Sequence, residues 1–419
     1  MVARLDQKRY LKLTPVDSAL KSLLREVGSP RVEVVPTTES LGRFSAKNYA
    51  AKWDVPRWDV AAMDGYAVRA ADLPDNGVSK LFTVRGRLSP GYVGTRLLGE
   101  GEAYYVSTGS RLPRGADTVV RVEETRFVDD RRVSIGVKLE RGKNVSRRGE
   151  DLRRGDLIVG CGERITPSSL SLLVYFGVRR VRVYRKPRVG VLSIGSELVD
   201  FENPSGGVGV YNNYSYLIAS YLKSLGLEPK RLGAVVDQVD TIVKTVDRLL
   251  NGLDVLITIG GTSVGVLDNT PDAVSAIPGS RVLFHGLRVV PLKPTGAVCV
   301  ESGGSKRFIL LLPAHVVSAA LSFHTICLPL LSTLSGGKPN ALSSRVSGLL
   351  TKPVENSRNI EALYLVELRT ENGDLLVSPL GWGSNLMSNL LRAGGFMRLE
   401  PNQTLKAGSR VTVNLLVPY

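Results

Sequence analysis

The sequence is 419 residues long, which is enough for two to four domains that each bury a core of their own. Hydrophobic residues make up 43% of the chain and charged residues 22%, which argues against long disorder. A net charge of +16 would suit a nucleic-acid-binding protein. However, the basic residues are spread along the chain without a zinc-finger spacing, an RNP-like aromatic motif or a convincing helix-turn-helix. We therefore consider nucleic acid an unlikely partner, and an anionic small substrate fits the charge equally well.

The cysteines and the N-terminus indicate a protein of the reducing cytoplasm. No basic segment followed by an apolar run opens the sequence, so no signal peptide is predicted. Cys161, Cys299 and Cys327 are far apart and have apolar surroundings. Their spacing suits neither a metal-binding pair nor a disulfide ladder, so we expect three small buried hydrophobic residues.

Residues 308–331 form an uncharged stretch that is long enough to span a bilayer. Pro313 and His315 interrupt it, and the run before Pro313 is short and typical of a strand. A buried strand, a tight turn and a buried helix explain the stretch better, so we expect no membrane partner. We expect His324, inside that helix, to be a hydrogen-bonded core residue.

The first 185 residues predict one helix and then mostly β structure. An amphipathic helix begins after Pro15 and ends before Gly28. From about residue 44 to 185, short apolar runs alternate with Gly, Pro and Asp turns, which is typical of strands. A helix at 167–176 interrupts them, and the basic residues of 179–188 alternate with valines as in a half-exposed strand at a domain border.

From Pro187 on, strands alternate with helices, which predicts a mostly parallel sheet that is covered on both faces. Such sheets bind ligands beyond the carboxyl ends of their strands. After Pro339 the β pattern returns and predicts a small closed sheet. The expected strands are 188–194, 232–236, 254–259 and 308–312, then 362–368, 375–378 and 410–417. The expected helices are 215–225, 237–250 with Asp237 as its cap, and one that Thr270-Pro271-Asp272 begins as N-cap and first turn.

The glycine-rich loop Gly260-Gly261-Thr262-Ser263-Val264-Gly265 follows a buried strand directly. Glycines let a loop turn tightly and expose consecutive N–H groups, which together with a hydroxyl form an anion cradle. Asp268 follows the loop. A carboxylate beside an anion cradle is unfavourable unless a cation such as Mg²⁺ joins the two, so we expect a metal-assisted site here. A purely structural Gly-Gly turn is the alternative.

Two further loops are expected at the same edge of the sheet. Asp237 ends the second strand and is either a ligand or a plain N-cap. The loop 312–315 precedes a helix whose N-terminus would face an anion. Upstream, Asp64 and Asp151 lie in compact acidic turns, for which surface turns with ion pairs are the alternative.

Four segments resemble the molybdopterin molybdenumtransferase family, which includes the E domain of gephyrin. They are AMDGYAVR at 62–69, TGSRLPRGADTVVRVEE at 108–124, RRGED at 147–151, and GGTSVG at 260–265 with Asp268. The resemblance runs in register from Pro15 to Tyr419. It implies a multidomain chain with a β-rich N-terminal half, an α/β three-layer molybdopterin-binding domain and a small C-terminal β-barrel.

The family architecture places the domain borders as follows: a linker-like subdomain at 1–43 and 146–185, a β-rich subdomain at 44–145, the α/β domain at 186–335 and the barrel at 336–419. The resemblance implies an elongated homodimer whose active site joins the α/β domain of one subunit with the β-rich domain of the other. It also implies Mg²⁺-dependent insertion of molybdate or tungstate into adenylylated molybdopterin with release of AMP. Other cofactor-assembly proteins are further expected partners.

The site residues follow from these loops and the resemblance together. Catalysis is assigned to Asp64, Asp151, Asp237 and Lys293, and a metal site to Asp237 and Asp268. Contacts with the pterin and its phosphates are assigned to Gly260, Gly261, Thr262, Ser263, Gly265, Ser196, Glu197, Asn212, Pro313, His315 and Ser318.

This sequence departs from the family pattern on loops of the α/β domain. Thr-Gly-Asp-Glu-Leu reads Ile194-Gly195-Ser196-Glu197-Leu198, Asn-Ser-Asn reads Asn212-Asn213-Tyr214, Lys-Pro-Gly-Lys-Pro reads Val290-Pro291-Leu292-Lys293-Pro294, and Gly-Leu-Pro-Gly-Asn-Pro reads Leu311-Leu312-Pro313-Ala314-His315-Val316. Losing one or two charged hydrogen bonds would weaken binding by about ten- to ten-thousand-fold. Arg288 and His315 are the candidates for replacing the lost positive charge. The changes also support an alternative function, that of a catalytically weakened paralogue that binds a pterin or nucleotide or acts as a scaffold.

Overall fold

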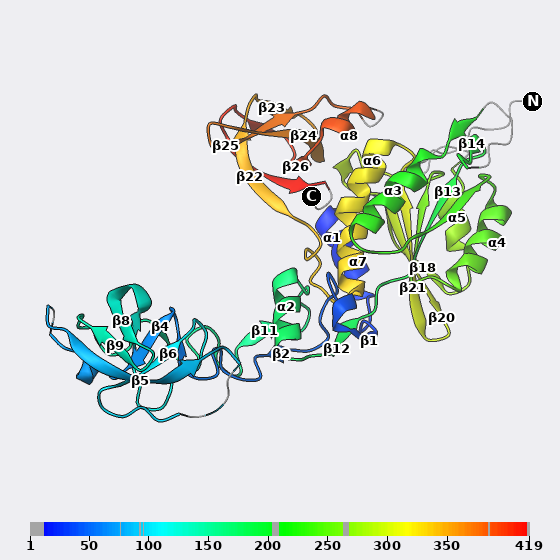
Figure 1. The fold of residues 1–419 in the computed structure, drawn as a ribbon. Helices are drawn as coiled ribbons and strands as arrows, with labels where there is room; N and C mark the ends of the chain where they lie inside the picture. Colours follow the sequence, from blue (N-terminus) through cyan, green and yellow to red (C-terminus); the bar gives the residue numbers. More distant parts are fainter. Residues whose placement is uncertain are drawn as a thin grey trace, which may run out of the picture. The chain divides into compact units, whose positions relative to one another are not determined.

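The computed structural model describes residues 12–75, 77–91, 94, 96–202, 209–262, 268–383 and 386–416 (Figure 1). Ser263 and Gly265 of the glycine-rich loop lie outside these residues. The chain divides into two compact units. Unit 1 comprises residues 1–47, 161–167 and 180–419, and unit 2 comprises residues 48–160 and 168–179.

A six-stranded sheet forms the centre of unit 1, in the order β16-β13-β17-β21-β20-β18. The first four strands run parallel, whereas β20 and β18 are antiparallel additions at one edge. The mostly parallel sheet predicted from the sequence is therefore confirmed, but β20 and β18 were not predicted. The bounds are β13 Val189–Ile194, β16 Lys230–Val235, β17 Val255–Ile259, β18 Ser280–His285, β20 Gly296–Ser302 and β21 Ser305–Leu312.

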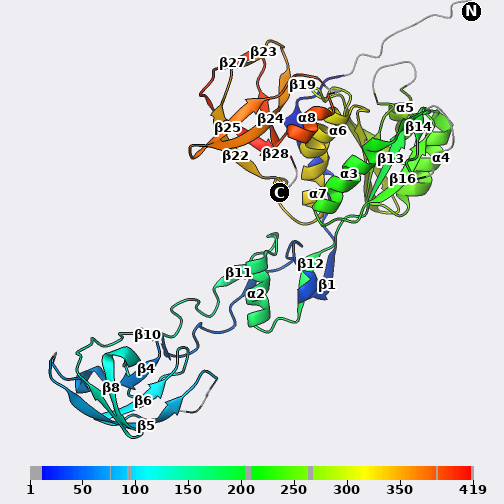
Figure 2. The ribbon, with the colours of Figure 1, turned by 45° about the horizontal axis from the view of Figure 1, so that its top comes forward.

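Helices cover both faces of this sheet, because its central strands carry apolar side chains on both sides. Leu310 and Leu312 belong to the core on one face, whereas Ile309 and Leu311 belong to the core on the other. Figures 1 and 2 show the helices of the two layers. The first layer holds α1 Val16–Arg25, α3 Asn213–Ser224, α6 Val316–Ser322 and α7 Leu328–Leu334, and the second holds α4 Val239–Leu250 and α5 Thr270–Ser275.

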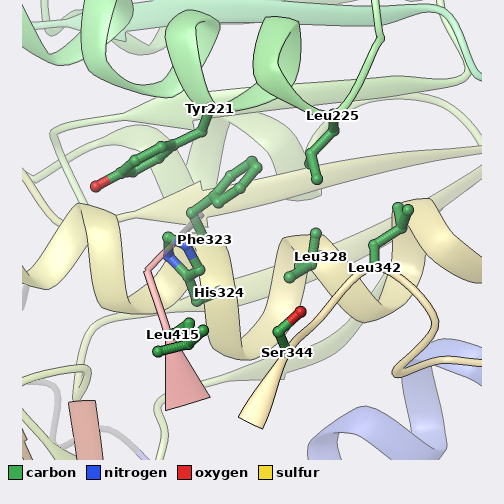
Figure 3. A pocket seen from close by; sticks show the side chains of 8 residues that line it. All are labelled: Tyr221, Leu225, Phe323, His324, Leu328, Leu342, Ser344 and Leu415. Atoms are coloured by element: carbon green, nitrogen blue, oxygen red, sulfur yellow. The ribbon is translucent and has the colours of Figure 1, made fainter. Parts of the chain in front are cut away.

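The uncharged stretch at 308–331 forms buried β21, a turn and a buried helix, as expected. A π-turn at Phe323–Cys327 joins α6 to α7, and the resulting helix Val316–Leu334 is long and apolar enough to cross a membrane, with a mean hydropathy of 1.6. However, 78% of that stretch is buried inside the protein, so we assign the helix to the core. Figure 3 shows His324 on it beside Phe323 and Tyr221, around a small cavity. Burial lowers the pKa of His324 to about 4, and its Nδ1 lies 2.8 Å from the carbonyl oxygen of Ala320.

Two predicted helix caps differ from those in the structure. Gln238, not Asp237, is the N-cap of α4, and its side chain forms no capping hydrogen bond within the described residues. Asn269 is the N-cap of α5, so Thr270 is already its first helical residue. The cap expected of Asp237 is thus wrong, and its carboxylate remains available for another use.

The C-terminal strands close into a barrel in the order β24-β25-β22-β28-β26, since β26 pairs back with β24. A core of its own fills the barrel. The short strand β19, Val289–Val290, pairs with β24 and ties the α/β domain to the barrel. The barrel strands are β22 Arg345–Leu350, β24 Glu361–Glu371, β25 Asp374–Pro379, β26 Gly395–Leu399 and β28 Arg410–Leu415. A separate strand pair, β23 Val354–Asn356 with β27 Gln403–Leu405, and the helix α8 Ser388–Arg392 are not part of the barrel sheet.

Three small elements complete unit 1. Strand β1, Val32–Pro36, pairs with β12, Arg180–Tyr184, and alternate residues of β12 are exposed, so the predicted half-exposed strand is confirmed. Strand β14, Leu198–Val199, pairs with β15, Val210–Tyr211, and a 3-10 turn, η1, spans Thr37–Glu39. Cys299 and Cys327 are buried as expected, but Cys161 is exposed, because it follows β11 at a turn. The prediction of a buried Cys161 is wrong.

Unit 2 is built on an antiparallel-rich sheet in the order β7-β4-β6-β5-β9-β8, with apolar clusters on both faces. Two short strand pairs, β2 with β11 and β3 with β10, lie outside it. The bounds are β2 Tyr49–Ala50, β3 Val60–Ala61, β4 Gly65–Val68, β5 Lys80–Leu88, β6 Glu102–Val106, β7 Thr118–Arg121, β8 Thr125–Asp129, β9 Arg132–Ile135, β10 Val145–Ser146, β11 Leu157–Val159 and α2 Pro167–Tyr175, with 3-10 turns η2 Ala70–Asp72 and η3 Val122–Glu124.

Candidate functional site

Four neighbouring parallel strands of unit 1 end at one edge of the sheet, and most of the predicted site residues lie on the loops that follow them. After β13 the chain continues to α3 on one face, whereas after β17 it continues to α5 on the other. In doubly wound sheets, ligands bind outside the carboxyl ends of neighbouring strands whose connections leave toward opposite faces. The loops carry Ser196 and Glu197 after β13, Asp237 after β16, Gly260–Thr262 after β17, and Pro313–His315 after β21.

Asp237 is held in place by the neighbouring loops. Its backbone N–H donates to the hydroxyl oxygen of Ser196 over 3.4 Å. The backbone N–H of Asn269 donates to its carboxylate over 3.3 Å, and the Asn269 amide donates to its carbonyl oxygen over 3.0 Å. Asn269 was not among the predicted residues, although it directly follows Asp268. These bonds fix a half-buried carboxylate at this edge of the sheet.

Three carboxylates influence one another at this edge. Partial burial raises the pKa of Asp237, hydrogen bonds from Asn269 lower it, and the negative charges of Asp268 and Glu197 raise it further, with a net upward shift. A carboxylate that is costly to ionise beside two others is stabilised by a bound cation.

The donor set fits Mg²⁺. Proteins hold this ion with one or two carboxylates, while water and substrate phosphates supply the remaining oxygen ligands. Asp237 and Asp268 provide such a pair. Among the described residues no group of three His, Cys, Asp or Glu side chains could hold a metal ion, so a fully protein-built cage is not what this edge offers.

The two glycines after β17 are required by the backbone. Gly260 has φ +108° and Gly261 has φ +61°, a region that favours glycine. A Cβ on Gly260 would lie 2.1 Å from the carbonyl oxygen of Ile194. A Cβ on Gly261 would lie 2.4 Å from Thr270 Oγ1 and 2.9 Å from Asp237 Oδ2. The loop therefore passes directly beside the carboxylate of Asp237.

Thr262 is buried, and its hydroxyl has no hydrogen-bond partner within the described part of the chain. Its carbonyl oxygen lies 2.9 Å from Nε2 of His285, at the end of the edge strand β18. An unpartnered buried hydroxyl is costly, so a ligand oxygen at this loop would relieve it. Sequence reasoning missed the contribution of His285, since it is 23 residues away along the chain.

The remaining predicted residues of unit 1 differ in their surroundings. Asn212 is 4% exposed and caps α3, where it accepts hydrogen bonds from the Ser215 N–H over 3.3 Å and the Ser193 hydroxyl over 2.7 Å. Its side chain thus has a structural use. Pro313 and Ser318 are buried and His315 and Lys293 are exposed, while Arg288 donates to the carbonyl oxygen of Asn359 over 3.1 Å.

In unit 2, Asp64 lies just before β4 and is exposed. Its Oδ1 accepts hydrogen bonds from the backbone N–H of Thr108 over 2.6 Å and from the Thr108 hydroxyl over 2.8 Å. These two bonds lower the pKa of Asp64 and keep it ionised. Thr108 begins the TGSRLPR segment, and it was not singled out because nothing in the sequence shows that it lies beside Asp64.

Asp151 lies in an exposed turn whose backbone N–H donates to the carbonyl oxygen of Val55 over 3.0 Å. Around it is a hollow of alternating charge, lined by Arg147, Arg148, Gly149, Glu150, Asp151, Arg153 and Asp156. The flanking arginine Arg148 pairs over 2.6 Å with Asp54 on another loop. The turn is thus anchored by Asp54, and the carboxylate of Asp151 is exposed.

Comparison with known proteins identifies three regions of the chain. Residues 14–177 match the MoeA N-terminal region (domain I and II), residues 190–333 match a probable molybdopterin binding domain, and residues 347–416 match the MoeA C-terminal region (domain IV). A solved structure of the molybdopterin biosynthesis MoeA protein from Pyrococcus horikosii matches with a TM-score of 0.80 and 28% identity, covering 97% of this chain and 100% of that one.

Similar curated proteins carry the name molybdopterin molybdenumtransferase. The protein of Bacillus subtilis (strain 168) is 29% identical over 96% of this chain and 94% of its own length. That of Haemophilus influenzae is 29% identical over 95% of this chain and 97% of its own length. That of Staphylococcus aureus (strain COL) is 30% identical over 68% of each chain.

Proposed function

We propose a reaction for this chain from its membership of the molybdopterin molybdenumtransferase family, a family of molybdenum cofactor biosynthesis. In this proposal the chain inserts molybdate or tungstate into adenylylated molybdopterin and releases AMP. The observation that carries the proposal is the edge of the sheet in unit 1. There a glycine turn, the half-buried carboxylate of Asp237 and the Thr262 hydroxyl, which has no partner among the described residues, lie together.

We propose distinct roles for these groups. The backbone of Gly260 and Gly261 receives an anionic group of the pterin nucleotide, and the Thr262 hydroxyl donates to one of its oxygens. Asp237 and Asp268 hold Mg²⁺, which when bound neutralises charge on the phosphates that separate when AMP leaves. Lys293 supplies a further positive charge, and Asp64, which Thr108 keeps ionised, and Asp151 of unit 2 are the other catalytic carboxylates.

The experiment is a turnover assay with the full chain, adenylylated molybdopterin, Mg²⁺ and molybdate, in which AMP release and reconstitution of an apo-molybdoenzyme are measured. We expect Asp237→Asn to lose AMP release by about a hundred-fold or more, as for a group that holds the catalytic metal. Asp247→Asn, an exposed aspartate on α4, is the matched control and should keep full activity.

The same assay decides the alternative function. The altered loops support a paralogue that binds the pterin nucleotide without turnover or acts as a scaffold. Tight binding of adenylylated molybdopterin with no release of AMP by the unaltered chain would establish that alternative and refute the transferase.

We further propose that the chain works as a cytoplasmic homodimer and exchanges its small anionic substrate with other cofactor-assembly proteins. Sedimentation of the full chain at micromolar concentration tests the dimer. A single species at the 45.3 kDa of one chain would refute it.

A further inference from the structure

Unit 2 contains a second hollow, next to the one around Asp151, that the proposed reaction does not use. Two loops form it, 52–58 and 148–154. We name it the cationic hollow, and it is lined by Lys52, Trp53, Asp54, Arg57, Trp58, Arg148 and Arg154. All of these residues belong to unit 2.

Asp54 holds the two loops together. Its Oδ2 accepts a hydrogen bond from Nε of Arg148 over 2.6 Å, and its Oδ1 accepts one from the backbone N–H of Arg154 over 2.8 Å. These bonds occupy both oxygens of the one carboxylate in the hollow. The Arg154 guanidinium is not involved in them, since only its backbone donates.

The tryptophans hold arginine side chains rather than an aromatic ligand. The guanidinium carbon of Arg57 lies 3.7 Å from the ring centre of Trp53, and that of Arg111 lies 4.6 Å from the ring centre of Trp58. The Trp53 ring also packs against Phe176, with centroids 5.1 Å apart. A guanidinium held over an aromatic ring by a cation–π contact still has N–H donors that can bind the oxygens of a phosphate.

The hollow has an excess of positive charge that its own residues do not neutralise. Four basic side chains face one carboxylate, a net charge of +3, whereas the neighbouring hollow has three basic and three acidic side chains and is neutral. Within the described residues, Lys52, Arg57 and Arg154 form no ion pair with a carboxylate. Unpaired like charges held together are unfavourable, and an anion between them removes that cost.

We propose that the cationic hollow binds a small tetrahedral oxyanion of the phosphate class, through Lys52, Arg57, Arg148 and Arg154. The chemistry is shared by a phosphate ester of a nucleotide or pterin and by molybdate, which is also a tetrahedral dianion. Single-stranded nucleic acid fits less well, since stacking of bases needs open aromatic faces and an arginine covers one face of each tryptophan here. The proposal concerns binding alone, so it stands whether or not the chain turns over its substrate.

The test is isothermal titration of the full chain with AMP, pyrophosphate, inorganic phosphate and molybdate in separate arms at low salt. Arg57→Gln and Arg154→Gln should each weaken binding of the preferred anion about ten-fold, and the double variant about a hundred-fold. Arg126→Gln, an exposed arginine on β8, removes the same charge elsewhere in unit 2 and should leave affinity within about two-fold. The anion whose binding the double variant weakens most identifies the source of the oxyanion.

A second readout places the anion. The sequence has three tryptophans, two of which line the hollow, so in a Trp382→Phe background all tryptophan fluorescence comes from Trp53 and Trp58. We expect the anion to change this fluorescence, and Arg57→Gln to abolish the change while Lys293→Ala in unit 1 preserves it. Unchanged affinity in the double variant, an equal loss in Arg126→Gln, or binding of oligonucleotides alone would each overturn the proposal. Since AMP release is measured separately, failure here and failure of the transferase are distinguishable.

Discussion

Asp237→Asn should stabilise the fold while it removes activity. At pH 7 the carboxylate is ionised although burial and two neighbouring carboxylates raise its pKa. Two like charges at the exposed edge of a sheet each cost about 0.5 kcal/mol, so the neutral amide should raise the free energy of unfolding by about 1 kcal/mol. The amide oxygen still accepts the hydrogen bond from the Asn269 N–H, so no contact is lost.

The difference in stability between the unaltered chain and Asp237→Asn should depend on pH. Because the pKa of Asp237 is raised in the folded state, the fold gains protons relative to the unfolded chain and loses stability as pH rises above the ordinary value of 3.8. The two proteins should therefore melt together below about pH 3.8, and the variant should melt about 2 °C higher at pH 7. Asp247→Asn is the control in the same scans.

Magnesium should reverse the order of the melting temperatures, so that the unaltered chain melts above Asp237→Asn. A cation that binds the folded state alone raises the melting temperature. Millimolar Mg²⁺ should thus stabilise the unaltered chain and have little effect on Asp237→Asn, and a chelator should restore the difference seen without metal. If the variant melts lower than the unaltered chain at pH 7, or if Mg²⁺ stabilises both equally, the proposed metal-binding role of Asp237 is refuted.

Three further predictions concern single side chains. Gly261→Ala adds a Cβ 2.4 Å from a hydroxyl oxygen at φ +61°, so it should cost about 1–3 kcal/mol in urea unfolding, whereas Gly252→Ala, with open space around it, should be nearly neutral. Glu26→Gln should lower the free energy of unfolding by about 1 kcal/mol, because hydrogen bonds from two basic side chains lower the pKa of Glu26 to about 2. This loss of stability should be complete above pH 4.5 and shrink as pH falls toward 2. A difference that does not depend on pH would contradict this. Thr108→Val removes one of the two hydrogen bonds that lower the pKa of Asp64, so the acid limb of the pH profile of AMP release should move to higher pH. Thr108→Ser keeps the hydroxyl and should leave this profile unchanged.

The strands that could be predicted are those whose pattern of burial is visible as a run or an alternation of apolar residues. The strands at 254–259 and 308–312 are continuous apolar runs, and β17 and β21 are buried along most of their length. The half-exposed strand β12 was equally clear from its alternation of arginine and valine. Strand β20 was missed although it is apolar, since a short apolar run beside glycine and proline has no periodicity that separates a strand from a loop.

Contacts between distant segments could not be predicted. Whether Asp237 caps a helix or faces a ligand depends on the backbone angles of Gln238, which the sequence does not determine. The bond of Thr262 to His285 arises only because the antiparallel strand β18 joins the sheet edge. The pairing of Asp64 with Thr108 likewise crosses 44 residues. In each case the residues were visible, but the fold decides which of them meet.

The loop after β21 departs from the family pattern at two residues, whose effect on turnover can be measured. The family's Gly-Asn reads Ala314-His315 here. Ala314 is not among the residues with positive φ in the described part of the chain, so its backbone does not need a glycine. His315 is the N-cap of α6, with φ −125° and ψ +125°, and in the part of the chain that the structure describes its side chain forms no capping hydrogen bond.

Reverting His315 to asparagine therefore has two separable effects. Asparagine is among the preferred N-cap residues, so His315→Asn should stabilise the buried helix by about 1 kcal/mol relative to His315→Ala. It also returns the family's amide to the loop after β21. If AMP release rises together with stability, the histidine weakens turnover and the chain is a partly disabled transferase. If stability rises while AMP release stays constant or falls, the histidine serves the site as it stands, because a cap alone changes the fold and not the chemistry.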